Sequence, residues 1–180
     1  MEITMKTNFI FVGMLPNYIS QVAEIVANKL DMFMINFEDM IQEEIGTATT
    51  LNNMLNSTDG QEKLLNIEKK VTKKIVDFEN SIVCISINAM VEEDNLKKIL
   101  QNANAVYLQI SPHFFEKRSK ETGDFFEAEI SDLTFGEKDK KWVDTSKIVL
   151  DCCKLKVKKA AKKLTKLCTQ YLQENNKEEA

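Results

Sequence analysis

Residues 8–20 read Asn8-Phe9-Ile10-Phe11-Val12-Gly13-Met14-Leu15-Pro16-Asn17-Tyr18-Ile19-Ser20, and this stretch decides the fold. Its first five residues form a short apolar run, which predicts a buried strand. Residues 19–30 carry apolar side chains at helical spacing, which predicts an amphipathic helix. A turn led by Gly13 joins the two. A strand, a glycine-led turn and a helix in this order form a common setting for binding a phosphate group.

Phosphate-binding turns of this kind often follow the pattern G-x-x-x-x-G-K-[ST]. Gly13 and Ser20 occupy its first and last positions, but Tyr18 and Ile19 stand where the second glycine and the lysine belong. In the pattern, glycines let backbone amides close around the phosphates and lysine supplies positive charge. Pro16 removes one further amide donor. The stretch therefore predicts a kinase fold without ordinary kinase chemistry.

The length and the charge of the chain narrow the class of protein. A chain of 180 residues fits one domain with a single substantial core. Its formal net charge of −4 makes a nucleic-acid partner unlikely. No apolar run approaches the roughly 18 residues of a membrane span. The N-terminus lacks a signal-peptide layout, so we expect a cytoplasmic protein.

The four cysteines give no sign of a metal site. They form no C-x-x-C pair, and the only histidine, His113, lies far from them in sequence. A zinc site needs about four ligands at workable spacings. We therefore expect reduced structural thiols and assign no metal ligand.

Strands and helices alternate along the rest of the chain. Further strands are predicted at residues 32–36, 81–87, 105–110 and 147–151, and further helices at 37–45, 61–78, 96–101, from Pro112 onward, and at about 154–174. This alternation predicts an α/β domain with a five-stranded parallel sheet and helices on both faces. We expect residues 1–174 to form one domain and 175–180 to be a frayed tail.

The order and spacing of these segments resemble the shikimate kinase family of small P-loop phosphotransferases. The resemblance runs from Asn8 to Leu172 and rests on five local matches: NFIFVG, INFEDMIQEEIG, DGQEKLLNIEKKV, SIVCISINAMV and AVYLQISP. It implies a three-layer P-loop kinase-like fold with strand order 2-3-1-4-5. It also implies a substrate-binding segment and a mobile lid, the latter at about residues 119–139.

The resemblance assigns roles to residues after the second strand. The family places two aspartates there, one helping to hold Mg²⁺ and one taking the proton of the substrate hydroxyl. Asn36 and Glu38 stand at these positions. Glu38 keeps a carboxylate and could act as base, or it could be a helix-start acid favoured by the macrodipole. Ser20 could offer its hydroxyl to Mg²⁺, although a serine at a helix start is more often a cap.

The family also grips the carboxylate of shikimate with arginines, because a planar guanidinium matches a carboxylate in bidentate fashion. Leu64-Leu65 stands where the family has Phe-Arg, and another family arginine corresponds to about Lys138. The triple-glycine turn after the third strand reads Ile87-Asn88-Ala89. Arg118, the only arginine, falls near a family arginine that stacks on adenine. A lone surface cation is an equally good account of it.

The lid-like segment and the last helix carry opposite charges. Acids fill the former, which has no arginine to stabilise a transferring phosphate: Glu121, Asp124, Glu127, Glu129 and Asp132. Seven lysines lie between residues 154 and 166. They could meet RNA or an anionic membrane, but a solvated helix face is favoured because no aromatic residues interleave them.

These departures favour a shikimate-kinase-like pseudoenzyme with a binding, regulatory or protein-interaction role. Its partner would be an unknown protein or small molecule, and no cofactor is expected. The alternative is an active but divergent ATP-dependent small-molecule kinase. ATP and Mg²⁺ would then bind near Gly13, Ser20 and Arg118. Glu38 would act as the base, and Lys138 and Glu38 would bind the substrate.

Overall fold

A computed structural model describes residues 8–47, 49–50, 53–54, 56–87, 92–124 and 132–178. The strands are β1 (Phe9–Gly13), β2 (Phe33–Asn36), β3 (Ser81–Ser86), β4 (Asn104–Gln109) and β5 (Ile148–Asp151). The helices are α1 (Pro16–Leu30), α2 (Phe37–Ile45), α4 (Thr58–Val76), α5 (Glu93–Asn102), α6 (Pro112–Thr122), α7 (Asp132–Thr145) and α8 (Val157–Glu178).

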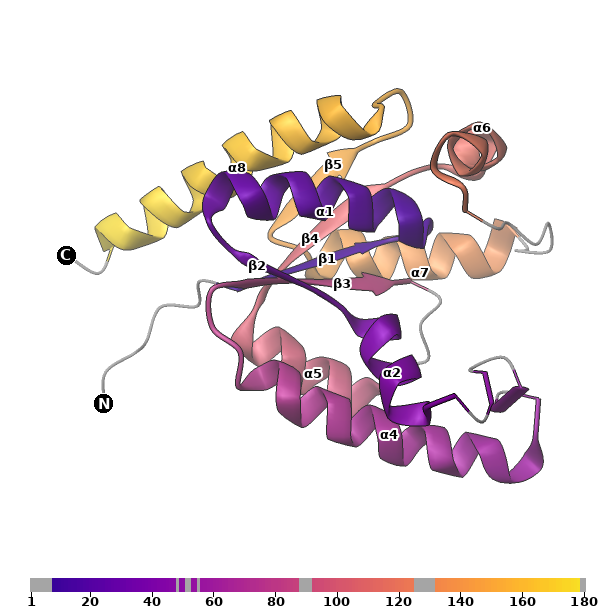
Figure 1. Cartoon of the computed structure of the whole chain (residues 1–180). Coiled ribbons are helices and arrows are strands. Elements are labelled where there is room, and N and C mark those ends of the chain that lie inside the picture. The colour runs from indigo at the N-terminus through magenta and orange to yellow at the C-terminus, as the bar shows by residue number, and fades with distance from the viewer. Residues whose placement is uncertain are drawn as a thin grey trace.

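The strands form one parallel sheet in the order β2-β3-β1-β4-β5. Helices α1 and α8 cover one face, and α4 and α5 lie on the other (Figure 1). β1 is the central strand, and all five of its residues are buried. A strand covered on both faces must be apolar throughout, as this one is except at Gly13. The prediction of a three-layer α/β fold with this strand order is confirmed.

Helix α1 begins earlier than its apolar spacing predicts. It starts at Pro16 rather than Ile19 and ends at Leu30, where the capping residue Asp31 has a left-handed backbone with φ of 55°. Proline suits the first turn of a helix because its φ is already helical and its missing amide would be unbonded there. The expected turn after β1 is therefore reduced to Met14 and Leu15.

The segment at 119–139 is less irregular than its polar sequence predicts. α6 continues to Thr122 and α7 begins at Asp132, while residues 125–131 lie outside the described part. α7 is held by tertiary contacts rather than by an apolar stripe. The carboxylate of Asp139 accepts hydrogen bonds from Tyr107 Oη at 2.7 Å and from Gln109 Nε2 at 3.0 Å. Trp142 is also buried.

The last helix, α8, also ends later than predicted. α8 continues to Glu178, past the expected end at residue 174, and Asn175 Nδ2 donates to the Tyr171 carbonyl at 3.0 Å. Within the described residues, no helix is both long enough and apolar enough to cross a membrane.

Candidate functional site

The candidate site lies where the carboxyl ends of β1, β2 and β3 meet the start of α1. In parallel α/β sheets, ligands bind at the carboxyl ends of the strands. Gly13, Asn36 and Ser86 end these three strands. The Ile87 amide donates to the Gly13 carbonyl at 2.8 Å, which ties the end of β3 to the end of β1.

The start of α1 fills the space that a phosphate-binding turn would leave open. Residues 16–20 are helical, and the Ile19 amide donates to the Leu15 carbonyl at 3.0 Å. The side chains of Leu15, Tyr18 and Ile19 are each 1% exposed. A Cβ on Gly13 would lie 3.2 Å from the Ile19 side chain and 3.0 Å from the Leu108 carbonyl oxygen. Gly13 therefore makes room for Ile19 in the core.

Tyr18 joins the start of α1 to the segment before α8. Its hydroxyl donates to the Leu155 carbonyl at 2.8 Å. Burial raises the pKa of Tyr18 well above its ordinary value, so the phenol stays neutral. A buried neutral phenol with a hydrogen-bonded hydroxyl acts as a structural anchor.

A carboxylate of the chain itself occupies the N-terminus of α1. Asp124 accepts hydrogen bonds from the Asn17 amide at 2.7 Å and from the Tyr18 amide at 3.2 Å. The Thr122 hydroxyl also donates to this carboxylate, and Asn17 Nδ2 donates to the Gly123 carbonyl at 3.0 Å. Anions are favoured at helix N-termini, where free amides and the helix dipole meet. Asp124 thus binds where a phosphate would otherwise bind.

Sequence reasoning missed this contact. The sequence placed Asp124 only among the acids of the lid-like segment. In the sequence, 107 residues separate Asp124 from Asn17. The usable signal was the combination of Gly123, which ends α6 in the left-handed region with φ of 72°, and an acid directly after it. That signal predicts the end of a helix but not the element it contacts.

Ser20, Asn36 and Glu38 come together at the closed end of the site. Ser20 Oγ donates to the Pro16 carbonyl at 2.9 Å inside α1, so the prediction of a helix-capping serine is wrong. Asn36 Nδ2 donates to Ser20 Oγ at 3.1 Å, and Asn36 Oδ1 caps α2 by accepting from the Glu38 amide at 3.0 Å. The space between them has a volume of ≈ 0 Å³, so no water molecule fits.

Glu38 is the helix-start acid considered from the sequence and also makes a tertiary contact, while its role as a base stays a prediction. It lies in the first turn of α2, as a helix-start acid would. Its Oε1 also accepts from the Ser86 amide at 2.9 Å, so it fastens α2 to the end of β3. Burial raises the pKa of Glu38, and the Ser86 amide partly opposes that rise.

The remaining predicted site residues lie apart from Glu38. Arg118 is 3% exposed, so a surface cation is the wrong account of it. It pairs with Glu121, and its Nη2 donates to the Cys153 carbonyl at 3.0 Å. Lys138 is half-buried on α7 and is not among the residues that enclose the space beside Glu38. The structure thus groups Gly13, Ser20 and Glu38 but leaves Arg118 and Lys138 elsewhere.

The cysteines and acids of the described part form no group of three or more potential metal ligands. All four cysteines are free, and Cys84, Cys152 and Cys168 are buried. A further buried acid, Glu68, lies on α4 among the buried residues of that helix. It is 2% exposed and accepts from the Glu92 amide at 3.1 Å.

A five-stranded parallel sheet in the order 2-3-1-4-5, with its candidate site beyond the central strand, defines the P-loop kinase-like class of α/β proteins. The shikimate kinase family model matches residues 20–174, so the chain belongs to the shikimate kinase family. This match begins at the last residue of the phosphate-binding pattern. The sequence matches none of the curated proteins.

Solved structures agree with this fold. Shikimate kinase from Acinetobacter baumannii in complex with shikimate superimposes with a TM-score of 0.70 at 14% identity, covering 93% of each chain. Shikimate kinase from Aquifex aeolicus gives 0.64 at 18% identity, covering 94% of this chain and 98% of that one. Dephospho-CoA kinase from Campylobacter jejuni gives 0.54 at 12% identity, covering 98% and 100%.

Proposed function

We propose that the chain is a shikimate-kinase-like pseudoenzyme that serves a binding, regulatory or protein-interaction role. The observation that carries the proposal is the carboxylate of Asp124 at the N-terminus of α1. A phosphate group needs those amides, and the carboxylate already accepts their hydrogen bonds. Binding a nucleotide there would require breaking both bonds and bringing like charges together.

Charge supports the same proposal. Phosphoryl transfer depends on cations that neutralise the developing negative charge. Among the described residues that enclose the space beside Glu38, none is a lysine or an arginine. Ile19 stands at the lysine position and is packed into the core. The residues present therefore do not fit a magnesium–nucleotide complex, and no cofactor is expected.

The active-kinase alternative also has an observation in its favour. Ser20, Asn36 and Glu38 meet at the carboxyl ends of the strands, where a hydroxyl and a carboxylate could hold Mg²⁺ and act as base. This alternative requires α1 to unwind at its start, because the space between them does not admit water. The side chains of Lys138 and Arg118 would also have to move toward this site.

The test measures both turnover and magnesium-dependent binding. We expect no ATP-dependent phosphorylation of shikimate, and calorimetry should show no binding of ATP that is strengthened by Mg²⁺. Turnover that is abolished by Glu38→Gln would overturn the proposal and establish the kinase. Glu43→Gln, at an acid of the same helix α2, is the matched control.

A further inference from the structure

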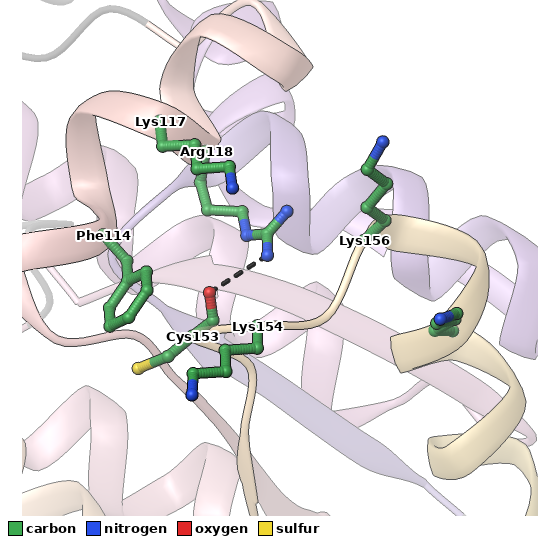
Figure 2. Close-up of a pocket in the computed structure, with 7 residues that line it drawn as sticks. Phe114, Lys117, Arg118, Cys153, Lys154 and Lys156 are labelled. Carbon is green, nitrogen blue, oxygen red and sulfur yellow. Dashed lines mark hydrogen bonds between the residues drawn. The ribbon is translucent and has the colours of Figure 1, made fainter.

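A separate cavity lies between α6 and the segment that joins β5 to α8 (Figure 2). Its volume is ≈ 200 Å³, and Cys153 forms part of its wall. The other lining residues are Phe114, Lys117, Arg118, Lys154, Lys156 and Lys159. Because five of these side chains are cationic, we call this cavity the basic pocket.

Arg118 is the buried part of the basic pocket. Figure 2 shows its side chain reaching from α6 toward the Cys153 carbonyl, to which Nη2 donates. Its Nη1 pairs with Glu121, but its Nε has no hydrogen-bond partner among the described residues. An unsatisfied donor on a buried charged group is costly. Arg118 lines the pocket, so a ligand oxygen there would meet its guanidinium and would supply the missing acceptor once the side chain turns to present Nε.

The four lysines of the pocket form no ion pair with a carboxylate, within the part of the chain that the structure describes. The nearby acid Asp151 accepts a hydrogen bond from the Cys153 amide at 2.9 Å, which lowers the pKa of Asp151, and the charge of Lys154 lowers it further. Asp151 therefore offsets part of the charge of Lys154 without pairing with it. The ammonium groups are exposed on flexible stems, so they can turn toward a ligand.

The position of the lysines argues against a role in stabilising α8. Lys156 directly precedes this helix, Lys159 lies in its first turn, and that turn contains no acid. A helix N-terminus already carries partial positive charge, so cations there are unfavourable unless an anion is present. The N-terminus of α1 meets this need internally, through Asp124. At α8 no described side chain does so.

We infer that the basic pocket binds a small polyanion with adjacent phosphate groups, held by Arg118 and by the lysines around the start of α8. The volume corresponds to about seven groups the size of water, each about 30 Å³ in the liquid, which leaves room for a pyrophosphate group. A larger neighbouring cavity of ≈ 530 Å³ shares Lys156 and Lys159 but is also lined by Glu121, so it leaves room for a part of the ligand that carries no negative charge. This inference does not depend on loss of kinase activity.

The test uses inorganic pyrophosphate as the probe, titrated into the full chain by calorimetry at low salt without Mg²⁺. Lys154→Gln and Lys156→Gln should each weaken binding by about tenfold, since each removes one charge-assisted contact. Lys166→Gln makes the same charge change on α8, outside the pocket, and should alter affinity by less than about twofold. Both pocket lysines are exposed, so these variants should fold.

Three outcomes would overturn the inference. The first is that pyrophosphate does not bind at millimolar concentration. The second is that all three substitutions weaken binding equally. The third is that adenosine competes for the pocket with the same affinity as pyrophosphate. The last would mark a site for a nucleobase rather than for phosphate. Nucleotide bound through this pocket would be weakened by Mg²⁺, which neutralises part of the phosphate charge, and weakened by Lys154→Gln, without turnover. The pseudoenzyme proposal fails only if turnover that depends on Glu38 is observed. Failure of the present inference can therefore be distinguished from failure of that proposal.

Discussion

At the scale of single residues, Asp124 decides what the start of α1 can bind. Its two carboxylate oxygens accept from consecutive amides, those of Asn17 and Tyr18, at 2.7 and 3.2 Å. This is the hydrogen bonding that a phosphate oxygen would require. The carboxylate is attached to the C-terminal end of α6, so it binds these amides at high effective concentration and contributes to stability.

Asp124→Asn should lower the free energy of unfolding by about 1 kcal/mol, because it removes a charge that interacts favourably with the N-terminus of α1. Urea denaturation followed by circular dichroism measures this. Asp144→Asn removes an exposed acid near the end of α7 and should change stability by less than about 0.5 kcal/mol. Equal effects of the two substitutions would show that Asp124 does not act as a helix anion.

Glu68 predicts a pH dependence of stability. Burial raises its pKa from 4.5 to about 7. The folded chain therefore holds this proton more tightly than the unfolded chain, and stability falls as pH rises from 4.5 through about 7. Above that range the folded protein bears the full cost of a buried charge.

Glu68→Gln should remove this dependence. At about pH 8 the variant should be more stable than the natural chain by roughly 1–3 kcal/mol, and at about pH 5 the two should be nearly equal. Urea titrations at both pH values measure the difference. Glu62→Gln, an exposed position on the same helix, is the control and should show no such change. If Glu68→Gln increased stability equally at both pH values, the raised pKa of Glu68 would be contradicted.

At the scale of elements, the sequence predicted those parts whose signals are local. The five strands are apolar runs, and Pro112 opens a helix as predicted. Pro16 opens a helix as well, but the predicted start of that helix was Ile19. α7 was missed because its sequence has a glycine in the middle and no apolar stripe. Its anchors, Tyr107 and Gln109, come from β4 and cannot be seen in the local pattern.

Two glycines in helices should respond to alanine with opposite signs. A Cβ on Gly60 in α4 would lie 2.0 Å from the Met54 carbonyl oxygen, so Gly60→Ala should destabilise by about 1–3 kcal/mol through overpacking. A Cβ on Gly136 in α7 meets nothing within 4 Å. Gly136→Ala should stabilise by about 0.5–1 kcal/mol, because alanine loses less backbone entropy in a helix. Thermal unfolding of both variants would test this, and the same sign for both would contradict it.

At the scale of the whole molecule, the sequence predicted the layers and the strand order, but it did not predict how the site is closed. The departures from the phosphate-binding pattern could be read directly from Tyr18 and Ile19. Their consequences could not, because they depend on contacts between distant elements: α6 with α1, and α1 with the segment before α8. The same elements meet around the basic pocket, where Arg118 extends from α6 to Cys153.

These contacts lead us to expect that residues 1–174 unfold as one cooperative unit. Trp142, the only tryptophan, is 6% exposed and reports on α7, whereas circular dichroism reports on all the helices. Because Asp139 ties α7 to β4 near the middle of the sheet, urea should give the same midpoint by both measurements. Tyr107→Phe removes one of these bonds and should lower both midpoints together, by about 1 kcal/mol in unfolding free energy. If tryptophan fluorescence changed before the helical signal, α7 would be a separate, less stable unit, and the single-domain prediction would be wrong.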